Sequence, residues 1–138
     1  MIQRLGSDPP GPFEDAVGYA RVVRAGPHVW VSGCTSVDAG GVVRGETPGE
    51  QMALAIDSLV RALERVGASA ADVVRTRLYV TDASRWEEVG RAHGAVFGDV
   101  RPATAMIEVH GLIDPRMLVE IEADAYVVPA TGQDPAAA

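Results

Sequence analysis

Apolar and polar positions in the first third of the chain form short alternating runs separated by Gly and Pro. Residues 19–25 and 29–32 alternate or run apolar over strand lengths, and a Gly-Pro-His turn at 26–28 joins them, which is typical of a β-hairpin. Val42 to Arg44 follow two glycines and form a candidate third short strand. This part of the chain is therefore predicted to contribute three strands.

The clearest helical pattern follows Thr47. A proline stands at the first helical position and Glu50 lies three residues after Thr47, which is the spacing of a capping box. Apolar residues then recur at steps of three and four, as on one buried helix face. They are Met52, Ile56, Leu59, Val60, Leu63 and Val66. Gly67 is placed to end this helix.

A strand and a second helix are predicted next. Residues 73–80 alternate between two sets, which is typical of a strand with one apolar and one charged face. The sets are Val74, Thr76, Leu78 and Val80 on one side, and Arg75, Arg77 and Tyr79 on the other. Ser84 and Glu87 have the spacing of another capping box. The inward stripe of that helix, before Gly98, is predicted to contain Trp86, Val89, His93, Val96 and Phe97.

Residues 103–109 and 118–128 alternate as two final strands. The order of elements predicts an α+β fold in two layers, a mixed β-sheet with two helices on one face. Alternation assigns to the helix-free face Tyr19, Arg21, Arg75, Arg77, Tyr79, Thr104, Met106, Glu108, Glu120, Glu122, Asp124 and Tyr126. This face is either solvated, or a contact between subunits that leaves polar crevices.

The chain of 138 residues has the size of one domain, which we assign to residues 1–128, with a Pro- and Ala-rich tail at 129–138 that is expected to fray. A net charge of -7 opposes binding to nucleic acid or to anionic membranes. The lone cysteine, Cys34, permits no intrachain disulfide. Because the sequence shows neither a signal peptide nor a membrane span, a soluble cytoplasmic protein is expected.

The sequence contains no phosphate-binding loop, paired-cysteine metal motif, dinucleotide fingerprint or His-Glu-x-x-His. No cofactor and no metal ion is therefore predicted, and His28, His93 and His110 are not spaced as ligands. Cys34 is either a packed thiol or a nucleophile that needs a basic partner. Glu120 is either a solvated acid or, on a face closed by a partner, a desolvated carboxylate with a raised pKa suited to proton transfer.

Several stretches together resemble one family. They are Tyr19 before the hairpin, VSG at 31–33, VVRTRLYVTD at 73–82, RPATAMIEV at 101–109 and LVEIEADA at 118–125. From about Tyr19 to Val128 the chain resembles the Rid superfamily, the YjgF-like proteins. The best-known branch of that superfamily hydrolyses reactive enamines and imines.

The resemblance implies a chorismate-mutase-like subunit in a homotrimer whose sheets face inward, with a small-molecule ligand in each cleft between subunits. In the deaminase branch, an arginine after the Pro-Ala of the penultimate strand holds the substrate carboxylate, and that position is Thr104 here. Threonine cannot form the bidentate ion pair that recognises a carboxylate. A glutamate of the final strand, which positions the hydrolytic water, corresponds to Glu120. The chain thus resembles a branch without the carboxylate-binding arginine.

Other pocket positions of the family differ or match. A helix asparagine corresponds to Gly90 and a cysteine to Met106, whereas Tyr19, Ser32 and Gly33 match. The resemblance therefore implies a relined crevice that keeps an aromatic wall, main-chain dipoles and one carboxylate.

The charge lost at position 104 has a candidate replacement. Arg21, rather than Arg101, lies on a strand face with Tyr19 and either supplies the missing positive charge or pairs with a carboxylate of the sheet. Loop proximity and helix phase place Glu14 and His93 near the cleft.

These residues favour a Rid-like hydrolase acting on a small C=N or enamine compound. Glu120 would orient water and move a proton, Ser32 and Gly33 would offer polar contacts, and Tyr19 and Thr104 would shape the pocket. The alternative is a non-catalytic trimer that binds a metabolite or a partner protein in the same crevices. A ribonuclease activity, which has been attached to some members of the superfamily, is disfavoured by the net negative charge and the missing basic patch.

Overall fold

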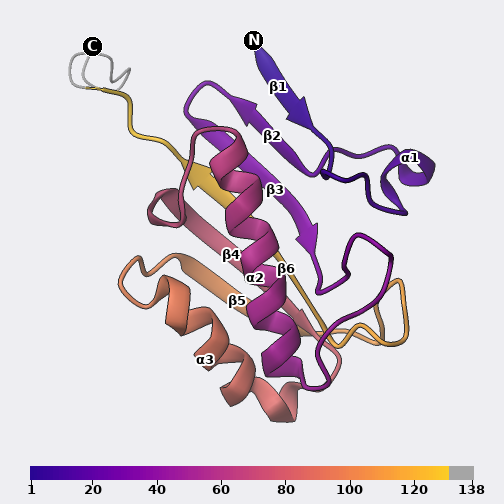
Figure 1. Cartoon of the computed structure of the whole chain (residues 1–138). Helices are drawn as coiled ribbons and strands as arrows, with labels where there is room; N and C mark the ends of the chain where they lie inside the picture. Colours follow the sequence, from indigo (N-terminus) through magenta and orange to yellow (C-terminus); the bar gives the residue numbers. More distant parts are fainter. Residues whose placement is uncertain (131–138) are drawn as a thin grey trace.

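The computed structural model describes residues 1–130, so most of the tail expected at 129–138 lies outside the described residues. The elements are β1 (Ile2–Leu5), α1 (Glu14–Val17), β2 (Val22–Ala25), β3 (His28–Cys34), α2 (Pro48–Arg65), β4 (Val73–Val80), α3 (Trp86–Phe97), β5 (Ala103–Glu108) and β6 (Val119–Tyr126). Short 3-10 turns, η1 (Ala70–Asp72) and η2 (Ala83–Arg85), precede β4 and α3. In Figure 1, α2 and α3 both lie on one face of the sheet.

The six strands form one sheet in the order β1-β2-β3-β6-β4-β5. Neighbouring strands are antiparallel except β4 and β5, which are parallel and are connected through α3. The sheet is therefore mixed. A parallel pair needs a crossover connection long enough to hold a helix, and α3 is that connection between β4 and β5. The predicted α+β fold, with two helices on one face of a mixed sheet, is confirmed.

Helix α2 forms as its local signals predict. Thr47 Oγ1 accepts a hydrogen bond from the Glu50 amide at 3.1 Å, and the Glu50 carboxylate accepts one from the Thr47 amide at 3.4 Å. Gly67, at a φ of 79° that favours glycine, follows the C-terminal end. The fully buried residues of the apolar stripe are Met52, Ile56, Leu59 and Leu63. Each contributes about 1.5–3 kcal/mol of burial free energy, which holds α2 on the sheet.

Three local predictions were wrong. Val42 to Arg44 form no strand, and a single bridge joins Val43 to Val37. The third N-terminal strand is instead β1, which pairs with β2 and was not predicted because its four residues show no apolar alternation. Ser84 does not cap α3, because its amide and hydroxyl donate to Asp82 within η2 and the helix begins at Trp86.

The apolar stripes of α3 and β4 also differ from their predictions. Trp86 and Val96 are exposed, whereas Val89 and Phe97 are fully buried as expected. Val74 is exposed because the pairing of β4 with β6 shifts register beside it. The rest of β4 keeps the predicted alternation, so its charged side chains lie on the helix-free face.

The prediction of which β5 residues lie on the helix-free face was wrong, because the alternation is shifted by one residue. Parallel pairing places Thr104 beside Thr76 and Met106 beside Leu78, and both β4 residues are buried toward the helices. Neighbouring residues of paired strands share a face, so Thr104, Met106 and Glu108 lie on the helix side. The helix-free face of β5 consists of Ala103, Ala105 and Ile107.

Polar groups are tolerated on the helix side of β5 because they find partners. Thr76 Oγ1 lies 2.8 Å from Thr104 Oγ1 and 2.9 Å from His93 Nε2, and Thr104 Oγ1 donates to the Pro102 carbonyl at 3.0 Å. The Glu108 carboxylate accepts from the Ala83 amide at 2.8 Å. These bonds compensate the loss of water at a partly covered sheet edge.

Candidate functional site

The candidate site lies where β3 leaves its regular pairing. Val31 pairs with Ala123 of β6 and Cys34 pairs with Ile121, so a bulge interrupts the register between Val31 and Cys34. Strand β2 begins only at Val22, opposite Val31. The main chain of Ser32 and Gly33 is thereby left with carbonyl groups that point away from the ladder.

Arg21 fills this opening. Its Nη1 donates to the carbonyls of Ser32 at 3.0 Å and Gly33 at 2.6 Å, and its Nε donates to Ser7 Oγ at 3.3 Å. The guanidinium carbon lies 5.6 Å from the centre of the Tyr19 ring, within cation–π range. The expectation that Arg21 pairs with a sheet carboxylate is wrong, because main-chain carbonyls take its hydrogen bonds.

Glu120 of β6 packs against the same stretch of main chain. A β-carbon added at Gly33 would lie 2.7 Å from Glu120 Cδ, so the glycine is required for the carboxylate to approach. Burial raises the pKa of Glu120; the positive charge of Arg21 opposes this effect, and the negative charge of Glu122 adds to it. Glu120 is therefore a carboxylate poised to bind a proton more readily than a solvated one.

Glu122, two residues along the same face of β6, has a different environment. The Tyr79 hydroxyl donates to its carboxylate, and Arg77 Nη1 lies 3.8 Å from it. The hydrogen bond to Glu122, followed by burial, raises the pKa of Tyr79. Two neighbouring carboxylates are thus held differently: Glu122 is fixed by donors, and Glu120 is half-buried against main chain.

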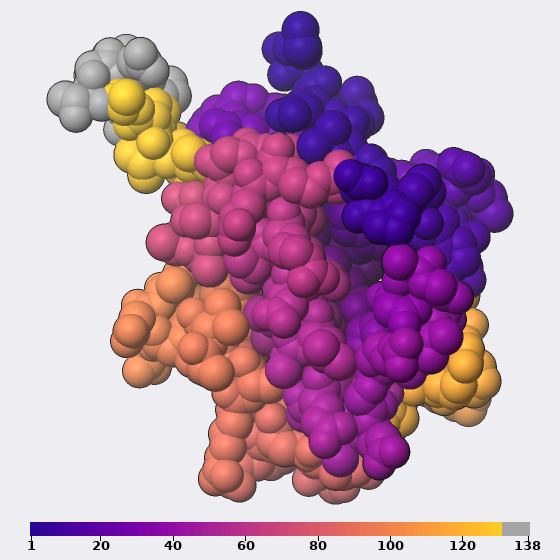
Figure 2. Space-filling view, in the orientation of Figure 1, coloured from indigo at the N-terminus to yellow at the C-terminus, as the bar shows by residue number. Residues whose placement is uncertain are grey.

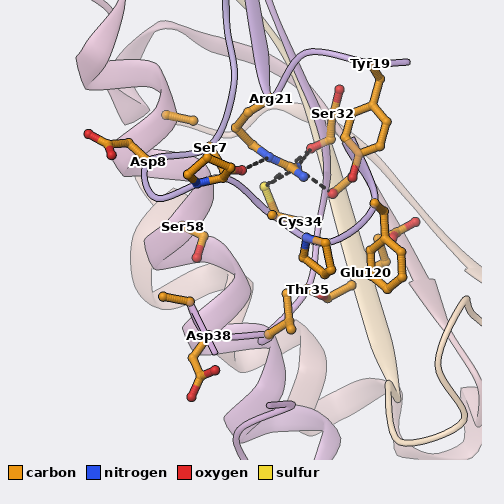
Figure 3. Close-up of a pocket in the computed structure, with 18 of the residues that line it drawn as sticks. Ser7, Asp8, Tyr19, Arg21, Ser32, Cys34, Thr35, Asp38, Ser58 and Glu120 are labelled. Atoms are coloured by element: carbon orange, nitrogen blue, oxygen red, sulfur yellow. Dashed lines mark hydrogen bonds between the residues drawn. The ribbon is translucent and has the colours of Figure 1, made fainter. Parts of the chain in front are cut away.

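These groups border a pocket of about 950 Å³. It is lined by an N-terminal segment at 7–13, the ends of β2 and β3, the loop at 35–39, one face of α2, and Ile113, Met117, Glu120 and Glu122. Figure 2 shows a hollow between the indigo N-terminal segment and the magenta helix α2. In Figure 3, Ser58 of α2 and Glu120 of β6 lie on opposite sides of Cys34.

Buried Glu14 ties the N-terminal segment to the pocket. Its Oε1 accepts from the amide and the hydroxyl of Ser7, both at 2.8 Å, and its Oε2 accepts from the Gly11 amide at 3.2 Å. Burial acts to raise the pKa of Glu14, but these hydrogen bonds outweigh it and the pKa lies below its ordinary value. Glu14 therefore shapes one wall of the pocket while lying behind it.

Cys34 is a packed thiol at the floor of the pocket. It is buried, and Sγ accepts from Arg21 Nη1 and donates to the Ser32 carbonyl, each at 3.4 Å. Burial raises the pKa of the thiol, against the effect of the Arg21 charge. The thiol is therefore held protonated, which favours the structural role over the nucleophilic one.

The structure brings together part of the residue set expected from the sequence. Tyr19, Arg21, Ser32, Gly33 and Glu120 line one pocket. The remaining three expected residues, Gly90, Thr104 and Met106, do not line it. Within one chain, Thr104 and Glu120 lie on opposite faces of the sheet.

Those three residues and His93 lie elsewhere in the described chain. Gly90 is in α3 near Trp86, and Met106 packs against the core. His93 contacts Phe97 and Thr76 beneath α3, where burial lowers its pKa. His93 is thus a neutral, half-buried histidine whose hydrogen bond to Thr76 links α3 to the sheet in this subunit.

Sequence reasoning missed the α2 wall and the N-terminal wall of the pocket. From α2 the pocket is lined by Ser58, Arg61, Ala62 and Arg65, which have the spacing of one helix face. That spacing borders the apolar stripe and was available in the sequence. Nothing in the sequence indicates that residues 7–13 fold back over this face, because their position depends on Glu14 and on the bond from Arg65 Nη1 to the Gly6 carbonyl at 2.6 Å.

Within residues 1–130, no three His, Cys, Asp or Glu side chains are grouped to hold a metal ion. The helices of this same part of the chain include none with the length and apolar character needed to cross a bilayer.

Comparisons with known proteins agree with this architecture. The family model described as Endoribonuclease L-PSP matches residues 12–127. An uncharacterized protein of Streptomyces coelicolor is 40% identical over 116 residues, covering 83% of this chain and 86% of that protein. A RutC family protein of Pyrococcus abyssi is 32% identical over 111 residues, covering 78% and 85%.

Solved structures show the same fold. A crystal structure of a YjgF/YER057c/UK114 family member, Rv2704 of Mycobacterium tuberculosis, has 49% identity and a TM-score of 0.84, and the match covers 92% of this chain and all of that one. A yeast structure, YEO7, shares the fold at a TM-score of 0.83 with 18% identity, covering 92% and 99%. The match to the family model, the 40% identity and the shared fold lead to one conclusion: the chain belongs to the YjgF/Rid family, whose sequence model is described as Endoribonuclease L-PSP.

Proposed function

We propose that this protein hydrolyses a C=N or enamine bond of a small molecule, and that it does so without the arginine used by the deaminase branch of the family. The observation that carries the proposal is the half-buried Glu120 carboxylate, packed over Gly33 at the edge of a 950 Å³ pocket. Tyr19 and Ser32 line the same pocket. A carboxylate with a raised pKa in such a pocket suits general acid–base catalysis.

In the proposed reaction, Glu120 accepts a proton from water as the water oxygen bonds to the carbon of the protonated C=N group, which gives a neutral hemiaminal. Glu120 then returns this proton to the nitrogen. The C–N bond breaks as the hydroxyl oxygen forms the carbonyl double bond, and the hydroxyl proton passes to Glu120. Hydrolysis of an imine in this way consumes one water and releases ammonia and a carbonyl compound. Arg21 holds the carbonyls of Ser32 and Gly33, and thus fixes the main chain against which Glu120 rests.

We further propose that three copies assemble with their helix-free faces inward. That face carries Trp30 and Ile107 at 44% and 40% exposure, beside the ion pairs from Arg77 to Glu122 and Asp124. A large apolar side chain among balanced charges suits a subunit interface. In such an assembly Glu120 borders a cleft between subunits, whereas Thr104 lies on the helix side of its own sheet.

The assay measures ammonia release from imines generated in situ: α-imino acids made by an amino acid oxidase, and neutral imines made from primary amines by an amine oxidase. Glu120→Gln is expected to lower the rate by about 10²-fold or more, because general acid–base catalysis contributes about 10²–10⁴-fold. Glu64→Gln, an exposed acid of α2 outside the pocket, is the matched control and should leave the rate unchanged. A Glu120→Gln protein as fast as the parent overturns the proposal.

A second candidate is a non-catalytic binder of metabolites. The observation that favours it is Thr104, whose hydroxyl bonds to Thr76 and the Pro102 carbonyl and so is committed to the fold. Ligand-induced thermal stabilisation with no product formed, across a metabolite panel, would select this candidate. The RNA cleavage named in the family description gains no support here, because a net charge of -7 disfavours a phosphate backbone.

A further inference from the structure

The two carboxylates near the start of β6 lean toward opposite neighbouring strands. Strand β6 lies between β3 and β4 in the sheet (Figure 1), and Glu120 and Glu122 alternate with buried residues on its helix-free face. The Glu120 carboxyl group packs against Gly33 of β3, whereas the Glu122 carboxylate accepts a hydrogen bond from the Tyr79 hydroxyl of β4. Side chains two residues apart on a strand start only about 7 Å from each other, so their partners impose the divergence.

Tyr79 holds the carboxylate that is not directly opposite to it. In the register of β4 and β6, Tyr79 pairs with Glu120 and Arg77 pairs with Glu122. Directly opposite residues have β-carbons about 5 Å apart, so the Tyr79 ring starts beside Glu120. Its hydroxyl nevertheless reaches diagonally to Glu122, and a phenol has a single proton to donate. Among residues 1–130, no group donates a hydrogen bond to the Glu120 carboxyl group.

The bond from Tyr79 is the stronger of the two contacts that hold Glu122. Arg77 Nη1 lies 3.8 Å from the Glu122 carboxylate and also 3.8 Å from that of Asp124, and these side chains are partly exposed. A shared, partly exposed ion pair of this length contributes little, whereas a phenol bonded to a carboxylate makes a charge-assisted hydrogen bond. The same bond raises the pKa of Tyr79, so the phenol stays protonated at neutral pH and remains a donor.

Without this hydrogen bond the two carboxyl groups can meet. Protonated Glu120 is a donor that has no acceptor in the described chain, and Glu122 without Tyr79 is an acceptor that has lost its donor. Two carboxyl groups at close range share one proton. The Glu120 carboxyl group would then bond within the protein and would be withdrawn from water and substrate.

We propose that Tyr79 is a positioning residue for the reaction: it turns Glu122 toward β4 and so keeps the Glu120 carboxyl group free, over Gly33, for water and substrate. This inference rests on the proposed function, because it takes Glu120 as the group that moves the proton. Tyr79 does not line the pocket, whereas Glu120 and Glu122 do. Tyr79 therefore acts through Glu122 and makes no contact with the substrate.

The ionisable groups that face Glu120 come from the strands around it. They are Arg21 and Cys34 on the β3 side, Glu122 on β6, and Arg77 and Tyr79 on β4. Arg21 is held by the carbonyls of Ser32 and Gly33, and Cys34 is a buried thiol. Removing the Tyr79 hydroxyl therefore frees Glu122 and leaves the charges on the β3 side in place.

The test is a pH titration of Glu120 by NMR, because the titration does not depend on turnover. The whole chain is isotopically labelled at the glutamate carboxyl carbons, and the signal of Glu120 is the one that is missing from Glu120→Gln. Tyr79→Phe should move the titration midpoint of Glu120 up by about one pH unit, because a proton shared with Glu122 stabilises the protonated form.

Tyr126→Phe is the matched control. Tyr126 lies on the same face of β6, its ring packs edge-on against His28, and its hydroxyl makes no hydrogen bond within residues 1–130. Removal of this hydroxyl should leave the midpoint of Glu120 unchanged. Thermal denaturation of both variants checks that the fold is intact.

Two further measurements separate positioning from a merely structural role. In a Glu122→Ala background, Tyr79→Phe should not move the midpoint of Glu120, because the residue through which Tyr79 acts is missing. In the imine assay, Tyr79→Phe should move the acidic limb of kcat to higher pH and leave KM within about twofold of the parent. A midpoint that is unchanged or lower in Tyr79→Phe, or an equal shift in the Glu122→Ala background, overturns the inference.

The two proposals fail separately. A shifted midpoint that depends on Glu122, together with no hydrolysis of any imine, would contradict the proposed function and support the positioning role of Tyr79. Hydrolysis that depends on Glu120, together with a midpoint that Tyr79→Phe does not move, would do the reverse.

Discussion

The carboxyl group of Glu120 lies so close to the main chain of Gly33 that no side chain fits between them. An added β-carbon would come 2.7 Å from Cδ and 2.9 Å from Oε2 of Glu120. The φ angle of Gly33 is outside the positive region, so the constraint is the contact and not the backbone conformation. The observed position of the Glu120 carboxyl group therefore requires glycine at position 33.

Gly33→Ala is expected to displace Glu120 and lower the imine hydrolysis rate at least tenfold. Overpacking of this kind costs about 1–3 kcal/mol of stability, which urea denaturation measures. Gly94→Ala, in α3 with open space around it, is the control and should stabilise by up to about 1 kcal/mol. A Gly33→Ala protein with the stability and rate of the parent would show that Glu120 moves freely.

Glu120→Gln should make the protein more stable at neutral pH. The folded-state pKa of Glu120 is raised, so its favourable contribution is complete below the unfolded value near 4.5 and is lost as pH rises through the folded value. Glutamine does not ionise, so the variant does not lose stability as the pH rises through the folded-state pKa of Glu120. Thermal denaturation should show a higher Tm for the variant at pH 7 and a vanishing difference below pH 4.5. A lower Tm at pH 7 contradicts the raised pKa.

Glu122→Gln should move the acidic limb of the hydrolysis pH profile to lower pH. The negative charge of Glu122 adds to the raised pKa of Glu120, and removing that charge lets Glu120 ionise more readily. Glutamine still accepts the Tyr79 hydrogen bond, so the geometry is retained. Glu87→Gln, on the far side of α3, serves as the control, and a shift of equal size in both variants would argue for a general charge effect.

Thr76→Val should destabilise the fold more than Thr104→Val. Thr76 is 0% exposed and bonds to both His93 and Thr104, so its loss leaves a half-buried imidazole nitrogen without this partner. An unsatisfied buried polar group costs about 1–3 kcal/mol, whereas Thr104 is exposed to water that can replace its bonds. Urea denaturation of both variants compares the two costs, and equal values would mean that His93 finds another partner.

Trp30→Asp should dissociate the proposed trimer, and Trp86→Asp should not. Both tryptophans are exposed in one chain, at 44% and 58%, but Trp30 lies on the helix-free face and Trp86 begins α3. A buried aspartate at a subunit contact has no water to solvate it. Light scattering should give one chain mass for the first variant and three for the second. A stable single-chain parent in dilute buffer would contradict the trimer itself.

The parts of the fold that the sequence predicts are those with local causes. The Thr47 capping box, the apolar stripe of α2 and the alternation of β4 are each determined by residues a few positions apart. For Glu120 the sequence left two alternatives open, a solvated acid or a carboxylate desolvated by a partner subunit, and burial within a single chain already raises its pKa. No partner subunit is needed for that effect.

The parts that the sequence does not predict depend on distant partners. In β5 both alternating sets mix small and polar residues, and only the parallel pairing with β4 decides that Thr104 shares a face with Thr76. Arg21 was expected to find a carboxylate, but the bulge in β3 exposes carbonyls that take its donors. A bulge is a matter of register between strands, which alternation along one strand does not reveal.

The bulge in β3 means that the floor of the pocket is built from peptide groups, with one guanidinium tying down the carbonyls of Ser32 and Gly33. Peptide groups are the same whichever side chains surround them. Substrate choice can then diverge through exchanges on the facing helix and in the N-terminal segment while the reacting end stays fixed. In such a fold the main chain beside the reacting group stays constant, while the side chains that line the rest of the pocket can change between relatives.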